Sequence, residues 1–215
     1  MTKDTHKLKY NIGVDKMNQI IVLDFGNEYN QDLLTIIVEE NLKANIMSYD
    51  TRAEQIESEK NVIGVILSGG YITKKEDDLD SFDGEILNLD MPILSLGRGM
   101  QVIINELGGT VTPAGYVYEP TPSKLTFHNT EKGIFKNGDK ERTVPLGFDA
   151  KVSKLPEGFH ILASGEEVKS GDDRPFGAME NPDKNIYGIQ FITKPSEEEK
   201  DEEAIRNFIR MCKDH

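Results

Sequence analysis

The chain of 215 residues lacks several features that define whole classes of protein. It has a single cysteine, Cys212, so an intrachain disulfide is excluded and a reducing, cytoplasmic setting is expected. No apolar run approaches the ~20 residues that a membrane-spanning helix requires, and we therefore expect no membrane partner. The first residues are polar and carry no apolar segment of the kind found in secretory signals.

Positive charge is also scarce. The chain has 25 Lys and Arg residues against 38 Asp and Glu residues, which gives a formal net charge of -13. Binding to a phosphate backbone requires clustered Lys and Arg, so the composition predicts no nucleic-acid partner. The acidic runs at 75–78 and 197–203 are interpreted as solvated faces rather than as binding sites.

The length and the ordinary hydrophobic fraction of 37% predict one globular domain. We assign residues 1–17 to a polar N-terminal extension and residues 18–215 to the domain itself. No internal repeat and no long linker divides it. We predict no metal site and no cofactor.

Strand and helix patterns alternate through the first half of the chain. This alternation predicts a parallel sheet with right-handed crossovers. Thr51 is expected to cap the second helix, and Gly108-Gly109 to end the fourth. The strand patterns cover 19–24, 45–48, 62–67 and 92–96, and the helical patterns cover 30–42, 51–58, 81–89 and 99–107.

Beyond Thr110 the pattern changes to short β candidates separated by turn residues. We therefore expect a mostly antiparallel second half that returns to the central sheet. Ser196, with Glu199 three residues later, predicts a capping box at the start of the last helix. The β candidates cover 124–128, 143–146, 160–164, 176–180 and 186–191, and the inward stripe of the last helix is Ala204, Ile205, Phe208, Ile209 and Cys212.

The most informative segment is 91–101, which runs from an apolar strand through glycines into an amphipathic helix. A sharp turn of this kind projects one side chain above the end of a parallel sheet, where a nucleophile sits in many enzymes. Here that position is Gly97, which has no side chain. Glycine adopts strained backbone angles with little penalty, so we expect the turn to persist without a nucleophile. Alternatively, Gly97 is simply the residue that the turn prefers.

Several motifs in order resemble the class I (triad) glutamine amidotransferase family, and most closely the glutaminase domain of GMP synthetase. The resemblance covers roughly residues 19–212 and implies a flavodoxin-like α/β fold, with a mostly parallel central sheet flanked by helices. The motifs are Ile21–Gly26 with Tyr29–Gln31, Leu67–Gly70, Gly97–Gln101, Leu107–Gly109, Leu155–Phe159, Ala178–Asn181 and Ile186–Phe191.

In that family a cysteine at the elbow attacks the glutamine amide, and a histidine and a glutamate after the Gln-Phe strand end activate it. The resemblance places these three roles at Gly97, Ile192 and Lys194, none of which retains the required chemistry. We therefore expect a catalytically inactive homologue that binds a protein partner or a small ligand. The alternative is a glutamine-hydrolysing subunit of a GMP-synthetase-like enzyme, supplying ammonia for purine nucleotide synthesis, with its triad provided in another way.

The ligand-binding candidates surround the empty elbow. They are the glycines of the resembled oxyanion loop, Gly69 and Gly70, together with Tyr71, Arg98 and Gln101. Arg98 and the amides of the first helical turn can bind an anion, but Arg98 can equally be a solvated arginine paired with an acid. Gln101 either lines a small pocket or satisfies backbone groups. The partners we expect are a synthetase-type protein or an anionic ligand.

Overall fold

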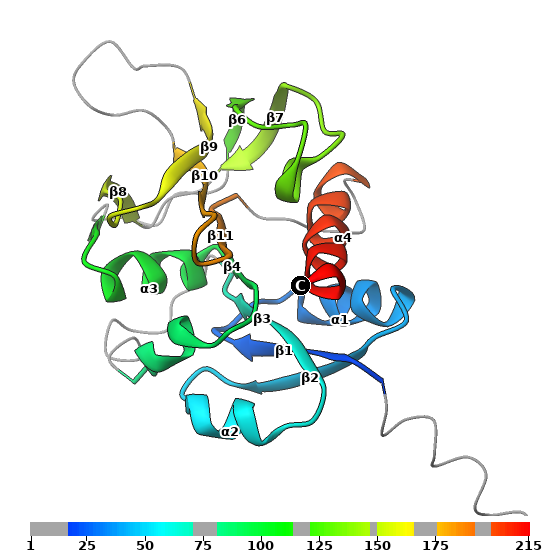
Figure 1. The fold of residues 1–215 in the computed structure, drawn as a ribbon. Helices are drawn as coiled ribbons and strands as arrows, with labels where there is room; N and C mark the ends of the chain where they lie inside the picture. The colour runs from blue at the N-terminus through cyan, green and yellow to red at the C-terminus, as the bar shows by residue number, and fades with distance from the viewer. Residues whose placement is uncertain (1–16, 71–80, 114–120, 147–149, 166–175, 192–198) are drawn as a thin grey trace, which may run out of the picture.

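The computed structural model describes residues 17–70, 81–113, 121–146, 150–165, 176–191 and 199–215. Its strands form a nine-stranded sheet in the order β2-β1-β3-β4-β11-β10-β9-β6-β7, and β5 and β8 form a separate pair (Figure 1). The strands are β1 (Gln19–Asp24), β2 (Lys43–Ser48), β3 (Val62–Ser68), β4 (Ile93–Leu96), β5 (Thr110–Pro113), β6 (Thr121–Phe127), β7 (Glu141–Leu146), β8 (Ala150–Lys154), β9 (His160–Gly165), β10 (Phe176–Asn181) and β11 (Ile186–Ile189). The helices are α1 (Asn30–Glu39), α2 (Ala53–Ser58), α3 (Arg98–Glu106) and α4 (Glu199–Asp214), with short 3₁₀ helices η3 (Gly84–Asn88) and η4 (Gly133–Phe135).

The large sheet changes character at β11. On one side, β2, β1, β3, β4 and β11 are parallel neighbours. On the other side, β10, β9, β6 and β7 continue the sheet by antiparallel pairing. Both predicted halves are therefore confirmed, as is the return of the last strand to the central sheet.

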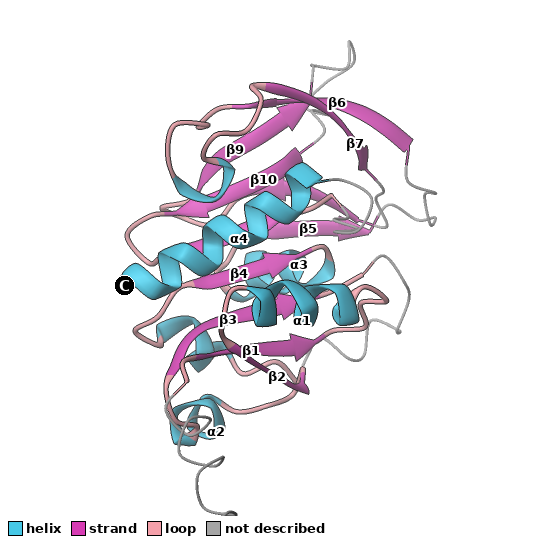
Figure 2. Ribbon diagram, turned by 90° about the vertical axis from the view of Figure 1, so that its right-hand side faces the viewer, coloured by secondary structure: helices cyan, strands magenta, loops and turns pink. Residues whose placement is uncertain are grey.

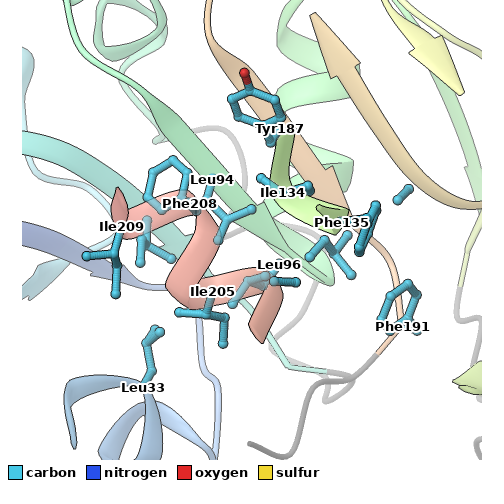
Figure 3. Packing of buried hydrophobic residues seen from close by; sticks show 14 of the residues in the cluster. Leu33, Leu94, Leu96, Ile134, Phe135, Tyr187, Phe191, Ile205, Phe208 and Ile209 are labelled. Carbon is cyan, nitrogen blue, oxygen red and sulfur yellow. The ribbon is translucent and has the colours of Figure 1, made fainter. Parts of the chain in front are cut away.

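Helices cover both faces of the parallel part. Helices α1 and α4 lie on one face (Figure 2), and α2, η3 and α3 pack with the core of the other. Figure 3 shows Ile205, Phe208 and Ile209 of α4 beside Leu94 and Leu96 of β4. The predicted inward stripe of the last helix is confirmed, because all five of its residues are buried.

The end of α3 follows the sequence prediction closely. Gly108 has a φ of +80°, and its N–H donates to the carbonyl oxygen of Asn105 at 3.1 Å. The N–H of Gly109 donates to the carbonyl oxygen of Ile104 at 2.8 Å. This pair of bonds is a Schellman motif, the glycine C-cap that Gly108-Gly109 predicts.

Several predicted boundaries are wrong. Helix α1 ends at Glu39 rather than at residue 42, because Asn41 adopts a φ of +60° and directs the chain into β2 two residues earlier than expected. Thr51 does not cap α2: its hydroxyl donates to the carbonyl oxygen of Ser48 at 2.6 Å, and Arg52 occupies the cap position.

Two further predictions need correction. The helix expected at 81–89 is only the 3₁₀ turn η3, which begins after Asp83, whose carboxylate accepts from the Glu85 N–H. The final strand pattern at 186–191 pairs only as far as Ile189. Residues 1–16 of the predicted extension and Ser196 of the predicted capping box lie outside the described residues. Within the described part of the chain, no helix has both the length and the apolarity needed to cross a bilayer.

Candidate functional site: a glycine-filled elbow

Gly97 is the point at which three elements meet. It follows β4, caps the N-terminus of α3, and has φ +50° and ψ −115°. Its N–H donates to the carbonyl oxygen of Ile189 at the end of β11, at 2.8 Å. Its carbonyl oxygen accepts from the N–H of Met100 at 3.0 Å, within α3. The sharp strand–turn–helix predicted from the sequence is therefore present.

The space beside Gly97 is occupied by backbone. An ideal Cβ on residue 97 would lie 2.6 Å from the carbonyl oxygen of Gly69 and 3.6 Å from that of Gly70. Real Cβ contacts essentially never fall under 3.0 Å. Any residue other than glycine at this elbow therefore requires the loop after β3 to move.

The Gly69-Gly70 loop is held just as closely on its other sides. The N–H of Gly69 donates to the carbonyl oxygen of Leu96 at 3.2 Å. A Cβ on Gly69 would lie 2.7 Å from the backbone nitrogen of Gly99, and one on Gly70 would lie 2.9 Å from the carbonyl oxygen of Gly26. The loop thus fits between the turn after β1 and the first turn of α3 only because its residues are glycines.

A hydrogen-bonded polar cluster supports this loop from below. The hydroxyl of Ser68 donates to Asn30 Oδ1 at 2.6 Å and accepts from Asn27 Nδ2 at 2.9 Å. Asp24 accepts from Asn30 Nδ2 at 2.8 Å and from the N–H of Gly26 at 2.8 Å. These bonds join the turn after β1 to the end of β3 and so fix where the glycine loop begins. Sequence reasoning missed the cluster, although Asp and Asn at a turn are its typical signal.

The predicted site residues divide into two groups. Gly69, Gly70, Gly97 and Arg98 meet at the elbow, and Gln101 lies in the first turn of α3, where its N–H donates to the Gly97 carbonyl oxygen at 3.4 Å. Arg98 is half-buried and Gln101 is buried. The other candidates, Tyr71, Ile192 and Lys194, lie outside the described residues.

Sequence reasoning also passed over Gln190, the residue directly after β11. Its side chain is 2% exposed, and its Oε1 atom is buried without a hydrogen-bond partner. Its backbone N–H donates to the Gly177 carbonyl oxygen at 2.8 Å. Gly188 faces Met100 of α3. Because side chains alternate along a strand, Gln190 is placed on the same face, toward the first turn of that helix.

The hydroxyl and thiol groups elsewhere in the core are committed to packing. Ser95 is fully buried in β4, and its hydroxyl donates to the Tyr187 carbonyl oxygen at 2.9 Å. Cys212 lies on α4, on the opposite face of the sheet from α3, and burial raises the pKa of its thiol far above the usual range. Neither group is available as a nucleophile at Gly97.

The described histidines do not supply a base there either. The Nε2 atom of His128 lies 2.9 Å from the hydroxyl of Ser164 on β9, and His215 lies at the C-terminal end of α4, 3.7 Å from Asp90. Across the described ranges, no group of three or more His, Cys, Asp or Glu side chains is placed to hold a metal ion. The elbow therefore has hydrogen-bonding groups and one cation, Arg98, rather than a described catalytic set.

A family model described as glutamine amidotransferase class-I matches residues 21–212. The chain belongs to the class I glutamine amidotransferase family. The resemblance read from the elbow and its neighbouring motifs is confirmed. Among related sequences, the GMP synthase [glutamine-hydrolyzing] of Streptococcus mutans is 35% identical over 202 residues. That alignment covers 93% of this amidotransferase-family chain but only 38% of the relative.

Other comparisons agree. The GMP synthase [glutamine-hydrolyzing] of Streptococcus pyogenes serotype M5 is 34% identical, with 93% of this chain and 37% of that one covered. A crystal structure from Thermoplasma acidophilum, whose description proposes one subunit of a GMP synthase, has a TM-score of 0.76 at 25% identity, covering 92% of this chain and 95% of that one. A glutamine amidotransferase of Thermotoga maritima shares the fold with a TM-score of 0.58 at 16% identity, covering 82% and 76%. The chain is therefore a GMP-synthase-like amidotransferase domain that spans under two-fifths of the length of these sequence relatives.

Proposed function

We propose that this domain is a catalytically inactive glutamine amidotransferase homologue that acts by binding a synthetase-type protein. The observation that carries the proposal is the contact between Gly97 and Gly69. A covalent attack on glutamine needs a sulfur or oxygen nucleophile and a base that removes its proton. At the elbow the nucleophile is absent, and the carbonyl oxygen of Gly69 lies 2.6 Å from where a Cβ would start.

The scaffold around this elbow supports retention for a purpose other than glutamine chemistry. The sheet, both cores and the polar cluster at Ser68 are intact, and Gly97 takes its backbone angles without the penalty that a side chain would incur. A surface is thereby maintained at the carboxyl ends of β3, β4 and β11. In open α/β sheets this is the edge at which ligands and partners bind.

Charge suggests the chemistry of that partner. Arg98 is half-buried at the start of α3, and the sequence places Lys194 after the end of β11. Both add positive charge beside the elbow of a chain whose net charge is -13. We therefore propose that the bound group is anionic, either an acidic segment of the synthetase-type partner or a phosphate-bearing metabolite that it carries.

The test is co-elution with the ATP-pyrophosphatase-type synthetase subunit of the same organism. Wild type and the control Lys124→Glu, whose exposed ion pair on β6 contributes little, should co-elute with that subunit. Arg98→Glu should reduce the bound fraction. Failure of the wild type to co-elute, or equal capture of wild type and Arg98→Glu, would contradict the binding proposal.

The second candidate is the active glutaminase subunit of a GMP-synthetase-like enzyme. The observation that favours it is the description of the sequence relatives as glutamine-hydrolysing GMP synthases. It requires a nucleophile and a base from outside the elbow residues described above. Glutamine turnover by the purified chain distinguishes it from our proposal.

A further inference from the structure

Exposed apolar side chains gather at one end of the large sheet. Among the described residues, the large hydrophobics with substantial exposure are Met17 (38%), Val38 (58%), Ile46 (44%) and Ile161 (45%). The first three surround β2: Met17 precedes β1, Val38 lies on α1 and Ile46 lies within β2. Only Ile161, on β9, lies elsewhere.

Val38 and Ile46 belong to the same face. Ile46 is in register with Val22 of β1, and Val22 is part of the core beneath α1. Neighbouring residues in register point to the same side of a sheet, so Ile46 lies on the α1 face.

The flanks of α1 place Val38 toward β2. Glu39 contacts Arg206 of α4 from one flank of the helix, and α4 lies on the β3 and β4 side of α1 (Figure 2). At 100° per residue, Leu34 and Val38 project from the opposite flank, toward β2. We call Leu34, Val38, Ala44 and Ile46 the β2-edge patch; Leu34 and Ala44 are its partly buried base.

The two edges of the sheet differ in protection. At one edge, β7 carries Pro145 and the charged pair Glu141 and Arg142, devices that discourage strand addition. At the other, β2 has the sequence KANIMS, with no proline and with Lys43 as its one charge. Among the described strands, β2 pairs only with β1. Its outer side is therefore an unprotected edge beside an apolar patch.

We propose that this edge binds a second copy of the chain, with β2 antiparallel to its counterpart across a two-fold axis perpendicular to the sheet. This arrangement keeps the α1 helices of both copies on the same side, so the two β2-edge patches adjoin. The register that places Ile46 opposite the partner's Ile46 also places Lys43 opposite the partner's Tyr49. An isologous interface of this kind is self-complementary, and it closes as a dimer.

The charges at the two ends of β2 favour the antiparallel arrangement with a second copy. Lys43 begins the strand, and Asp50 lies just beyond its end; both are exposed. Antiparallel pairing brings Lys43 of each copy beside the Tyr49-Asp50 turn of the other, whereas parallel pairing would oppose like charges. Residues 44–47 between them are uncharged, so two copies with a net charge of -13 meet there without burying a carboxylate.

The interface is small, because it consists of one strand and one helix flank from each copy. We therefore expect a dissociation constant in the micromolar range. Sedimentation velocity on the full chain, from low micromolar to several hundred micromolar, should show a reversible monomer–dimer equilibrium. Monomers throughout this range would overturn the proposal.

Matched variants then locate the interface. Ile46→Lys opposes two lysines at the two-fold axis and should weaken the dimer by at least about tenfold, equivalent to about 1.4 kcal/mol. Ile161→Lys replaces an equally exposed isoleucine on β9 and should leave the dissociation constant unchanged. Equal effects of the two variants, or none from Ile46→Lys, would place the contact elsewhere. Circular dichroism checks that both variants remain folded.

A charge exchange tests the antiparallel register. Lys43→Asp should weaken the dimer, because it places an acid beside the partner's Asp50. The double variant Lys43→Asp/Asp50→Lys should recover the wild-type dissociation constant. Absence of recovery would reject the proposed register and with it this mode of self-association.

Discussion

The carbonyl oxygen of Gly69 lies 2.6 Å from the point at which residue 97 would carry a Cβ atom. The loop after β3 and the turn after β4 are therefore in direct backbone contact, at the place from which a nucleophile projects in related scaffolds. Gly97 has a positive φ of +50°, and the N–H of Gly69 bonds to Leu96. Conformation and packing consequently demand glycine at the same position.

The first prediction concerns the stability of this elbow. Gly97→Ala should lower the free energy of unfolding by about 2–4 kcal/mol, because the backbone strain of about 1–3 kcal/mol adds to an overpacking cost of similar size. Denaturant unfolding monitored by circular dichroism measures this change.

Gly108→Ala is the matched control. Gly108 also has a positive φ, +80°, but a Cβ there would meet nothing within 4 Å. This variant should therefore lose only the conformational part, about 1–2 kcal/mol. An equal loss in the two variants would show that the Gly69 carbonyl oxygen does not restrict residue 97.

The second prediction is that Gly97→Cys does not restore glutaminase activity. Members of a catalytic triad act as a unit, so one restored member returns little. The resemblance places Ile192 and Lys194 at the positions of the base and its orienting acid, which leaves the new thiol without activation. Ammonia release from glutamine at family-like rates would reveal a base supplied by another residue.

The same variant offers a chemical readout of the elbow. A thiol at residue 97 lies near the N-terminus of α3 and Arg98, both of which favour the thiolate. Native Gly97→Cys should therefore take up one iodoacetamide label by intact mass, while wild type takes up none. The control is Cys212, whose thiol is 3% exposed and whose pKa is raised by burial, so it should react only after unfolding.

Much of the fold could be predicted from local patterns. The apolar runs of β1 and β3 and the helical stripe of α4 each carry their own periodicity, and Gly108-Gly109 marks the end of α3 by its own conformation. Strands β5 and β8 were not predicted from periodicity. They are short, and they pair with each other from positions about forty residues apart, so their stability comes from a contact that neither segment specifies alone.

The site shows the same division. The elbow and its missing side chain follow from the order of residues at 91–101. The closure of the elbow by the Gly69 carbonyl oxygen does not, because it depends on how two separate turns approach in space. The polar cluster of Asp24, Asn30 and Ser68 likewise joins side chains from two loops.

The third prediction is that free glutamine binds poorly. Ile192 replaces a polar base with an apolar side chain, and Tyr71 adds bulk beside the resembled oxyanion loop, so we expect the pocket to offer glutamine few polar partners. Isothermal titration of the wild type with glutamine should show no saturable heat at micromolar to low millimolar ligand. Saturation at micromolar glutamine would show that the pocket has kept its specificity.

The fourth prediction concerns pH and the ion-pair network between α1 and α4. Burial tends to raise the pKa of Glu40, but hydrogen bonds from Lys213 and Arg206, each at 3.0 Å, hold it below its ordinary value of 4.5. The folded state therefore favours the ionised carboxylate. The resulting stabilisation is present above the unfolded pKa and is lost as the pH falls from about 4.5 through the lowered folded value.

Glu40→Gln should accordingly lower the free energy of unfolding at pH 7 by about 1 kcal/mol, a modest value because solvent screens part of the network. The difference from wild type should shrink as the pH falls below 4.5. Glu141→Gln is the control, since its pair with Lys124 is more than half exposed and should contribute little at any pH. A destabilisation that does not change with pH would assign the effect to packing.

Glutamine hydrolysis tests the central claim most directly. The purified chain is assayed at high concentration for ammonia and glutamate release, alone and with the synthetase-type subunit. We predict no release above a protein-free blank in either case, because Gly97 offers no nucleophile and the Gly69 carbonyl oxygen lies against the place where one would begin. Turnover that co-purifies with the chain through successive columns would contradict the account and identify the domain as a working glutaminase.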